Sequence, residues 1–250
     1  MPTIWISRPP HRAEKLAAAL KEHHLQPLLY AAMCIRELAD ESALESYLAN
    51  IDDYTASVFV SREAVTRVAQ RLSAATTAPT FPALAIGSET AAALPPCYQL
   101  LQPASTTISD SRYLLQAEAL QGTGGNIAIL GGSDEANTPP AAWLCEALVA
   151  RGHRITAVPC YCRHAAAANA TLAAQGQAGA IDGAVAYSGD SLRFMLQMTA
   201  PHNDWLRALP LFVIHANIAT TAAALGFSQV VPVEQNTIAA EIARYFVSLK

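Results

Sequence analysis

The chain has 250 residues, of which 52% are hydrophobic and only 14% are charged. This composition is typical of a globular protein, and the length suits one large domain or two of ordinary size. The formal net charge of −4, without any run of Lys or Arg, argues against nucleic acid as a partner. The longest apolar runs have the length of a strand, so we expect no membrane span, and the start lacks the pattern of a signal peptide. We therefore expect a cytoplasmic protein.

Short β-branched runs alternate with Ala- and Leu-rich helical patterns, which is typical of parallel βαβ units. We expect strands at residues 3–7, 26–30, 57–61, 83–87, 98–101, 126–131, 155–159, 183–188, 211–215 and 229–233. We expect helices at residues 12–23, 40–50, 63–73, 89–94, 109–120, 139–151, 167–176, 190–199, 217–225 and 237–249. Ten strands predict two α/β lobes, each with a parallel sheet of five strands.

The two halves of the chain resemble each other. Residues 58–65 are echoed by residues 185–192, and residues 85–91 by residues 213–219, at spacings of 127 and 128. A repeat of this length indicates a duplicated domain and not a short solenoid module. Two similar lobes that face each other make a cleft, and ligands usually bind in such clefts.

The repeat allows two ways of wiring the lobes. A cut near the midpoint would give two lobes in tandem. In the crossed arrangement, which we favour, residues 1–33 join residues 165–250 in one lobe and residues 37–160 form the other. Residues 31–36 and 160–166 are then paired crossovers, because each follows an equivalent strand at a spacing of 128 residues.

The five cysteines are odd in number and lie in apolar surroundings. Cys160 and Cys162 alternate along one strand, so we expect both thiols on one face, which is neither a redox Cys-x-x-Cys nor a zinc knuckle. We expect reduced, structural cysteines, as in a reducing compartment. No clustered His or acidic residues indicate a metal site.

Ligands of an open parallel sheet bind beyond the carboxyl ends of its strands. Small neutral hydrogen-bonding residues are expected there: Ser7-Arg8, Ser61, Gly87-Ser88, Gly131-Gly132-Ser133, Ser188 and His215–Asn217. Turns of this kind expose N–H groups with a partial positive charge, which suit carboxylates or phosphates. Plain helix capping explains any single one of them better. The expectation of an anion-binding cleft therefore rests on the whole set.

Standard catalytic signatures are missing from the sequence. Gly122–Gly125 precedes a strand and does not follow one, so it reads as a turn and not as a phosphate loop, and no Gly-x-Ser-x-Gly elbow occurs. Asp134-Glu135 reads as a solvated helix start and not as a catalytic dyad. Tyr161 lies inside a proposed crossover, where its phenol either faces the space between the lobes or packs as an ordinary strand tyrosine.

Several short motifs follow one another in a distinctive order and spacing. They are Ser7-Arg8-Pro9, Phe59-Val60-Ser61-x-x-Ala64-Val65, Ala85-Ile86-Gly87-x-x-Thr90-Ala91, Ile108-Ser109-x-Ser111-x-x-Leu114-Leu115, Cys160-Tyr161-x-Arg163, Tyr187-Ser188, and Ile218-Ala219 leading to Leu225-Gly226-Phe227. In these motifs, over essentially its whole length, the chain resembles the uroporphyrinogen-III synthase family. The resemblance implies two flavodoxin-like lobes joined by a two-stranded linker.

The resemblance also implies an activity. Hydroxymethylbilane, a linear tetrapyrrole with eight carboxylates, would lose water and close through a spiro intermediate to uroporphyrinogen III, with ring D inverted and without cofactor or metal. Tyr161 matches the linker tyrosine of the family and would be an acid or its positioner. The residues expected to bind substrate carboxylates are Arg8, Ser61, Ser88, Thr90, Ser188 and Asn217. We expect a monomer that binds neither nucleic acid nor membrane.

Two other functions compete with the synthase. Two α/β lobes with a hinge also describe a cytosolic small-molecule binding protein without catalysis, and a nucleotide- or flavin-binding protein is a third possibility without a phosphate loop to support it. The chain also departs from the family pattern at two places. Residues 131–135 lack an arginine that relatives often carry, and His215-Ala216-Asn217 replaces residues that are commonly small or hydroxyl-bearing.

Overall fold

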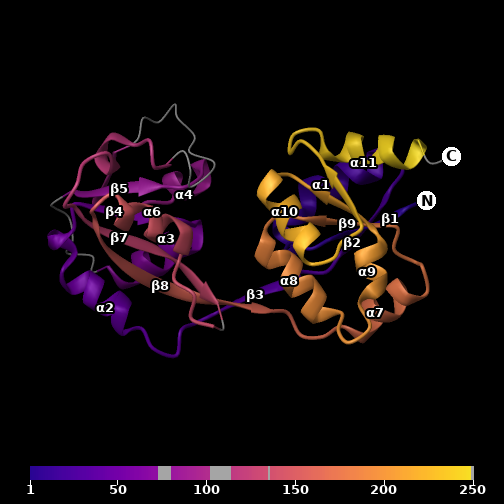
Figure 1. Ribbon diagram of the computed structural model, residues 1–250, viewed down its shortest axis with the longest axis horizontal. Coiled ribbons are helices and arrows are strands. Elements are labelled where there is room, and N and C mark those ends of the chain that lie inside the picture. Colours follow the sequence, from indigo (N-terminus) through magenta and orange to yellow (C-terminus); the bar gives the residue numbers. More distant parts are fainter. Residues whose placement is uncertain (73–79, 102–113, 135, 249–250) are drawn as a thin grey trace. The chain divides into compact units, whose positions relative to one another are not determined.

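The computed structural model describes residues 1–72, 80–101, 114–134 and 136–248. It divides into two compact units (Figure 1). Unit 1 comprises Met1–Cys34 and His164–Lys250, and unit 2 comprises Ile35–Arg163. Each unit has its own sheet.

Short strands alternate with helices along the described chain. The strands are β1 (Thr3–Ile6), β2 (Gln26–Leu29), β3 (Met33–Arg36), β4 (Ala56–Phe59), β5 (Phe81–Ala85), β6 (Tyr98–Leu100), β7 (Asn126–Asp134), β8 (Arg154–Ala165), β9 (Gly183–Ala186), β10 (Pro210–Val213) and β11 (Gln229–Pro232). The α-helices are α1 (Pro10–Glu22), α2 (Ser42–Ala49), α3 (Arg62–Arg71), α4 (Ser88–Ala92), α6 (Ala142–Ala150), α7 (Ala170–Gln177), α8 (Gly189–Met198), α9 (Asp204–Ala208), α10 (Ala216–Ala224) and α11 (Ile238–Val247). Two 3-10 helices, η1 (Ile51–Asp53) and η2 (Glu118–Leu120), complete the set.

The sheet of unit 1 has five strands in the order β11-β10-β9-β1-β2, and all neighbouring pairs are parallel. When the five strands are numbered by their place in the chain and read from the β2 edge, the order is 2-1-3-4-5. This is the flavodoxin-like order of a doubly wound sheet. The central strands β9 and β10 are buried over their whole length. Helices that cover both faces of a parallel sheet bury its strands on both sides.

The sheet of unit 2 has six strands in the order β3-β8-β7-β4-β5-β6. By the sequence repeat, β7, β8, β4, β5 and β6 correspond to β1, β2, β9, β10 and β11, so the five equivalent strands have the same spatial order in both units. The expected α/β fold of two lobes with parallel sheets is therefore confirmed. The prediction of five strands in the second sheet is wrong by one, because β3, in the segment predicted as a crossover, pairs at its edge.

Helices cover both faces of the unit 1 sheet. The cluster around Ile4 and Ile6 packs against α1 and α11, whereas Trp5, which points to the opposite face, packs with residues of α7, α8, α9 and α10. Figure 1 shows α1 and α11 together on one side of this sheet, and α7, α8 and α9 on the other. The alternation of side chains along β1 thus joins two apolar cores through one strand.

Unit 2 has the same layering. Residues of α2 and α3 pack on one face of its sheet, and residues of α6 pack on the other. Three hydroxyl groups lie buried on the face that α2 and α3 cover. The Tyr47 hydroxyl is 2.8 Å from Ser57 Oγ and 3.0 Å from the Tyr98 hydroxyl. Burial raises the pKa of both phenols, that of Tyr47 to about 12.

Several elements differ from the sequence-based expectation. Strand β7 continues through Gly131 and Gly132 to Asp134, because β8 pairs with it over that length. The predicted helix at 109–120 falls partly on residues 109–113, outside the described residues, and its described part ends in η2. Helix α9 lies in a segment where no helix is expected, and α6 begins at Ala142 and not near residue 139.

Alkaline pH is expected to destabilise the protein partly through Tyr47. The pKa of this phenol is about 12 in the native state and about 10 in the unfolded chain. Between these values the native state keeps a proton that the unfolded chain loses, so the free energy of unfolding falls as pH rises. Tyr47→Phe lacks this contribution, on the order of 2 kcal/mol. Its free energy of unfolding, measured in urea from pH 8 to 12, should decline less steeply than that of the wild type.

The same substitution lowers stability at neutral pH, because the Ser57 and Tyr98 hydroxyls lose their shared partner. The comparison therefore concerns the slope against pH and not the absolute stability. Tyr245→Phe, on α11 in unit 1, is the matched control. If Tyr47→Phe declined as steeply as the wild type, the assigned role of Tyr47 would be wrong.

Candidate functional site

Unit 2 brings two of the predicted site residues together. Ser61 follows β4 and is the N-cap of α3, where its Oγ accepts a hydrogen bond from the N–H of Ala64 at 3.2 Å. Tyr161 lies on β8, two strands away in the sheet. Its hydroxyl is 3.0 Å from Ser61 Oγ. The serine thus both caps a helix and holds the phenol.

A β-bulge lets Tyr161 reach across the intervening strand. Gly131 pairs with Pro159, but the next residue of β7, Gly132, pairs with Tyr161, so Cys160 is the extra residue. Cys160 and Tyr161 therefore pack in the same apolar cluster on the α3 face, where an unbroken strand would send them to opposite faces. The expected alternation that would put both thiols of Cys160 and Cys162 on one face is interrupted here, since Cys162 is not part of that cluster.

The Tyr161 phenol is held in its protonated form. The side chain is only 6% exposed, and burial raises its pKa above the ordinary value, although the Ser61 hydrogen bond and the charge of Arg163 act in the opposite direction. Arg163 donates hydrogen bonds to the carbonyl oxygens of Ser133 and Gly132, both at 3.3 Å. These bonds hold the end of β7 beside the tyrosine.

The other two predicted residues of unit 2, Ser88 and Thr90, lie at the start of α4, just after β5. Gly87 adopts the left-handed region at φ 87°, and α4 starts at the next residue, Ser88, which is exposed. Thr90 is buried, with 4% exposure. Since β4 and β5 are parallel neighbours, this turn and Ser61 lie at the same edge of the sheet.

In unit 1, Arg8, Ser188 and Asn217 follow β1, β9 and β10, which are neighbouring parallel strands. They therefore lie at one edge of that sheet. The Arg8 guanidinium stacks on the ring of Tyr187, with Cζ 3.6 Å from the ring centroid. Burial raises the pKa of Tyr187, while the charge of Arg8 lowers it. The contact joins the ends of two adjacent strands.

The hydroxyl of Ser188 takes part in a capping box at the start of α8. Its Oγ accepts from the N–H of Ser191 at 3.1 Å, and Ser191 Oγ accepts from the N–H of Ser188, also at 3.1 Å. Asn217 is exposed in the first turn of α10, and the N-cap residue His215 makes no side-chain capping bond. Helix capping thus accounts for Ser188, while Asn217 presents its amide to solvent.

Sequence reasoning did not assign the contacts that three residues make at these edges. Tyr187 is the platform for Arg8, Arg163 anchors the end of β7, and buried Ser7 donates from Oγ to the carbonyl of Val185 at 2.9 Å. Tyr187 and Arg163 belong to the family-like motifs and Ser7 stands at a strand end, so the sequence indicated all three positions. Their contacts depend on strand order, which the local sequence does not specify.

Asp134 ends β7 and organises the following turn. Partial burial raises its pKa, but hydrogen bonds from the N–H groups of Thr138 and Ala136 outweigh this, and the pKa lies below its ordinary value. Glu135 lies outside the described residues. Among the described residues, no three His, Cys, Asp or Glu side chains form a group able to hold a metal.

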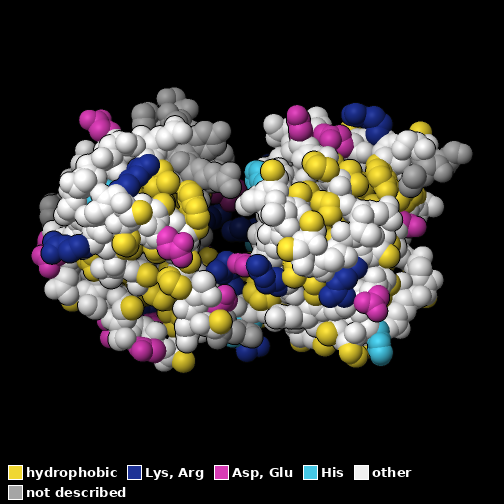
Figure 2. Space-filling view, in the orientation of Figure 1, with side chains coloured by type: hydrophobic (Ala, Val, Ile, Leu, Met, Phe, Trp, Pro, Cys, Tyr) yellow, Lys and Arg dark blue, Asp and Glu magenta, His cyan; other side chains and the backbone are white. Residues whose placement is uncertain are grey.

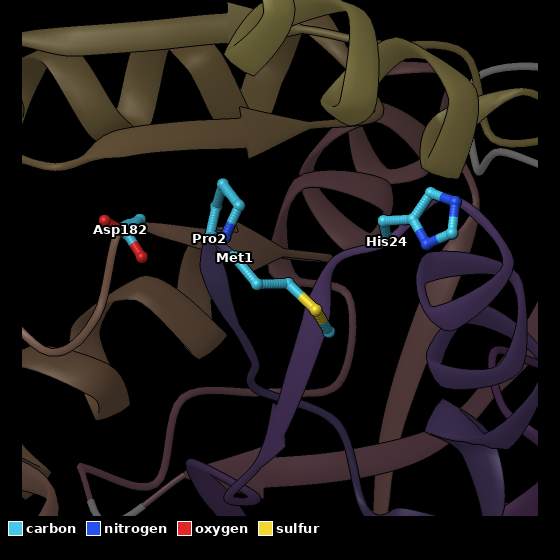
Figure 3. A pocket seen from close by; sticks show the side chains of 4 residues that line it. All are labelled: Met1, Pro2, His24 and Asp182. Atoms are coloured by element: carbon cyan, nitrogen blue, oxygen red, sulfur yellow. The ribbon is translucent and has the colours of Figure 1, made fainter.

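A shallow hollow of about 450 Å³ lies elsewhere in unit 1, lined by Met1, Pro2, His24 and Asp182 (Figure 3). All four precede the strands β1, β2 and β9, so the hollow lies at the amino edge of the sheet. The Asp182 carboxylate accepts a hydrogen bond from the N–H of Thr3 at 2.7 Å, which ties two strand starts together. This hollow is therefore separate from the turns at the carboxyl edge.

Surface charge and helix length are the features that concern nucleic-acid and membrane partners. On the face seen in Figure 2, Lys and Arg side chains are dispersed over both units and do not form one continuous band. No helix in the described part of the chain is long and apolar enough to cross a membrane.

Fold and turns together define a doubly wound α/β protein of two similar units, each with polar turns at the carboxyl edge of its sheet. The model of the family described as Uroporphyrinogen-III synthase HemD matches residues 14–243. The chain belongs to the uroporphyrinogen-III synthase family, hydro-lyases of porphyrin biosynthesis, and this family implies hydroxymethylbilane as the substrate. The family match decides against the two competing functions considered from the sequence.

Solved structures agree with this fold. A mutant uroporphyrinogen III synthase of the extremely thermophilic bacterium Thermus thermophilus is similar, with 16% identity and a TM-score of 0.62, covering 100% of this chain and 99% of that one. The uroporphyrinogen-III synthetase of Helicobacter pylori is also similar, with 13% identity, a TM-score of 0.55 and 100% of both chains covered. At these identities the likeness shows the fold alone. No curated protein matches the chain significantly.

The hydrogen bond between Ser61 and Tyr161 is expected to show as strong coupling in stability. Ser61→Ala removes a helix cap, worth about 1 kcal/mol, and leaves a buried phenol hydroxyl without its partner, which costs about 1–3 kcal/mol. Tyr161→Phe should cost about 1 kcal/mol, since Ser61 still caps α3. In Ser61→Ala/Tyr161→Phe no phenol is stranded, so the loss should be smaller than the sum of the two single losses.

Urea unfolding of the four proteins measures this coupling. Thr66→Ala, an exposed position on the same helix, is the control and should change stability by less than about 0.5 kcal/mol. Strictly additive losses would show that the two hydroxyls do not interact.

Proposed function

We propose that Ser61 and Tyr161 form the reacting edge of the site in which this synthase converts hydroxymethylbilane to uroporphyrinogen III. The observation that carries the proposal is the 3.0 Å contact between their hydroxyls at the carboxyl edge of the unit 2 sheet. Family membership provides the reaction: water is lost, the chain closes on ring D, and that ring is inverted. The residue roles are the part that we add.

The pattern of donors and acceptors favours Ser61 as the group that meets substrate. A serine oxygen has two acceptor sites, and the N–H of Ala64 occupies one of them. If the buried Tyr161 phenol donates to the other, its own proton is satisfied, and the Ser61 proton is left to donate outward. If Ser61 instead donated to the Tyr161 oxygen, the buried phenol proton would need another acceptor, and an unmet buried donor is costly. Ser61 is half-buried, whereas Tyr161 is buried, so of the two residues Ser61 is the more open to solvent.

The chemistry needs only modest help from these hydroxyls. The pyrrole nitrogens of the substrate itself drive loss of the terminal hydroxide and stabilise the cation that forms. A hydrogen bond from Ser61 would assist the departing oxygen, and Tyr161 would act through Ser61 as a positioning residue. The larger task is to hold the chain so that ring D is attacked at its substituted carbon, which is catalysis by proximity and orientation.

Helix starts are the proposed binding places for the substrate carboxylates. The first turns of α3, α8 and α10 expose N–H groups at the carboxyl edges of the two sheets, and such groups favour anions. Glu63 and Asp190 lie in the first turns of α3 and α8, but each is paired with an arginine, Glu63 with Arg67 at 3.0 Å and Asp190 with Arg193 at 3.3 Å. The first turn of α10 carries no acid.

The individual roles follow from exposure. Ser88 and Asn217 are exposed and are proposed to contact carboxylates directly, as is Ser188. Buried Thr90 is proposed to support the turn beneath Ser88. Arg8, held on the Tyr187 ring, would add a charge-assisted hydrogen bond.

The remaining expectations belong to the same proposal. The two units, with boundaries at residues 34/35 and 163/164, support the assignment of residues 1–33 with 165–250, and of residues 37–160, to two duplicated lobes. The five free cysteines suit a reducing compartment such as the cytoplasm. A monomer that needs no cofactor stays a prediction.

Removing either hydroxyl is expected to slow ring closure. Tyr161→Phe and Ser61→Ala should each lower kcat by about tenfold, equivalent to one well-placed hydrogen bond, and change KM less. The measurement is chromatographic separation of type III product from the type I isomer that forms spontaneously, at a temperature where every variant is folded. Tyr245→Phe should have wild-type turnover. If folded Ser61→Ala had wild-type turnover, the proposed role would be refuted.

Ser188 offers a test of carboxylate binding that separates charge from folding. Asp caps a helix as well as Ser does, so Ser188→Asp should keep the stability of α8 while its charge repels the substrate and raises KM severalfold. Ser188→Ala should instead lower stability by about 1 kcal/mol and affect KM less.

The control is Ser228→Asp, which adds the same charge at the amino edge of the same sheet, before β11. Its KM should equal that of the wild type. Equal increases in KM for both aspartate variants would indicate a general charge effect, and an unchanged KM in Ser188→Asp would exclude a carboxylate near α8.

A further inference from the structure

We infer that Gly132 is a positioning residue for the reaction, because its missing side chain is the space through which the Tyr161 ring crosses β7 to reach Ser61. The inference rests on the proposed function of the Ser61–Tyr161 pair. It adds a residue that touches neither substrate nor the reacting atoms but determines where the phenol lies.

The geometry at Gly132 is restrictive. A Cβ atom on this residue would lie 2.4 Å from Tyr161 Cε2, 2.7 Å from Cζ and 3.0 Å from Cδ2. These separations are far below the van der Waals contact of carbon atoms. The ring therefore covers the position of the missing Cβ, and any side chain at residue 132 must displace the ring or the strand.

The strand is less free to move than the ring. Arg163 donates to the carbonyl oxygens of Gly132 and Ser133, and Ser133 Oγ donates to the carbonyl of Tyr161 at 3.4 Å. Strand β7 also pairs with β8 as far as Asp134, while its pairing with β4 ends at Leu130. A Cβ at residue 132 would therefore push the Tyr161 ring, and with it the hydroxyl that meets Ser61.

The backbone gives no other reason for a glycine here. The φ angle of Gly132 lies outside the left-handed region, unlike that of Gly87, so alanine can adopt its conformation. Glycine weakens a strand interior, and its presence often marks a place where another group approaches closely. Neighbouring Gly131 is different, since its Cβ would meet Val60 and Pro140 and not the tyrosine.

The experiment is a double-mutant cycle between residues 132 and 161, made in the full chain. Gly132→Ala should lower kcat for type III product by about tenfold, the same loss as in Tyr161→Phe, because the displaced phenol no longer positions Ser61, with a smaller change in KM. In the Tyr161→Ala background the ring is absent, so adding Gly132→Ala should lower kcat no further. Gly122→Ala has open space around its Cβ and serves as the matched control with wild-type turnover.

A spectroscopic measurement reports the ring directly. The alkaline absorbance titration of the wild type, minus that of Tyr161→Phe, isolates the Tyr161 phenol, whose burial holds its pKa above the ordinary value. The same difference for Gly132→Ala, minus Gly132→Ala/Tyr161→Phe, should show ionisation at lower pH, because the displaced ring is more exposed. A role of Gly132 that did not involve the ring would leave this titration unchanged.

Folding is controlled within the same set. If Gly132→Ala is too unstable to assay, Gly132→Ala/Tyr161→Ala should recover the melting temperature of Tyr161→Ala, because the colliding ring has been removed. The loss caused by Gly131→Ala should persist in the Tyr161→Ala background, since its collision is with other residues.

Three outcomes would overturn the inference. Wild-type kcat and titration in Gly132→Ala, while Ser61→Ala and Tyr161→Phe remain slow, would refute it and leave the proposed function intact. Equal losses from Gly132→Ala with and without the Tyr161 ring would show that residue 132 acts by another route. Wild-type turnover in Ser61→Ala and Tyr161→Phe would refute the proposed function, and the inference with it.

Discussion

Parallel strand pairing is the constraint on which the rest of this structure depends. Because neighbouring strands run in the same direction, their carboxyl ends meet at one edge, and the turns that start the following helices gather there. In unit 1 this brings Arg8 beside Tyr187 although they are far apart in the chain. In unit 2 it places Ser61 beside the turn at Ser88, because they follow the neighbouring strands β4 and β5. Helices on both faces bury the strands, so the edges are where polar groups remain available.

The Ser61–Tyr161 contact shows how irregular geometry serves such an edge. Tyr161 comes from β8, and its ring must cross β7 before it meets a residue that follows β4. A bulge at Cys160 turns the ring toward the α3 face, and a glycine on β7 leaves the room. Without the bulge the ring would point to the other face, and a side chain at residue 132 would collide with it. Two local departures from an ideal strand therefore decide where a buried phenol lies.

Charge is handled locally in this protein. In the proposed function a chain with net charge −4 binds a substrate with eight carboxylates, so a long-range attractive field would not be its means of binding. Helix starts act over the first turn only, and the acids in the first turns of α3 and α8 are paired with Arg67 and Arg193, of which Arg67 also binds Glu37. In the proposed site Arg8 adds one cation, which is stacked on the ring of Tyr187. This arrangement favours orientation of the substrate over attraction from a distance.

The sequence by itself determined the α/β class, the duplication and most element positions, because burial periodicity and helix-start residues such as Ser61 and Ser188 are local signals. It also identified the family through motifs spread along the whole chain. Only the tertiary structure decided that β3 joins the second sheet, that β7 runs on through Gly131 and Gly132, and that Tyr161 contacts Ser61. Those features depend on which strands lie side by side and on a register shift between them. Pairing partners far apart in the chain, and a one-residue bulge, leave no local pattern in the sequence.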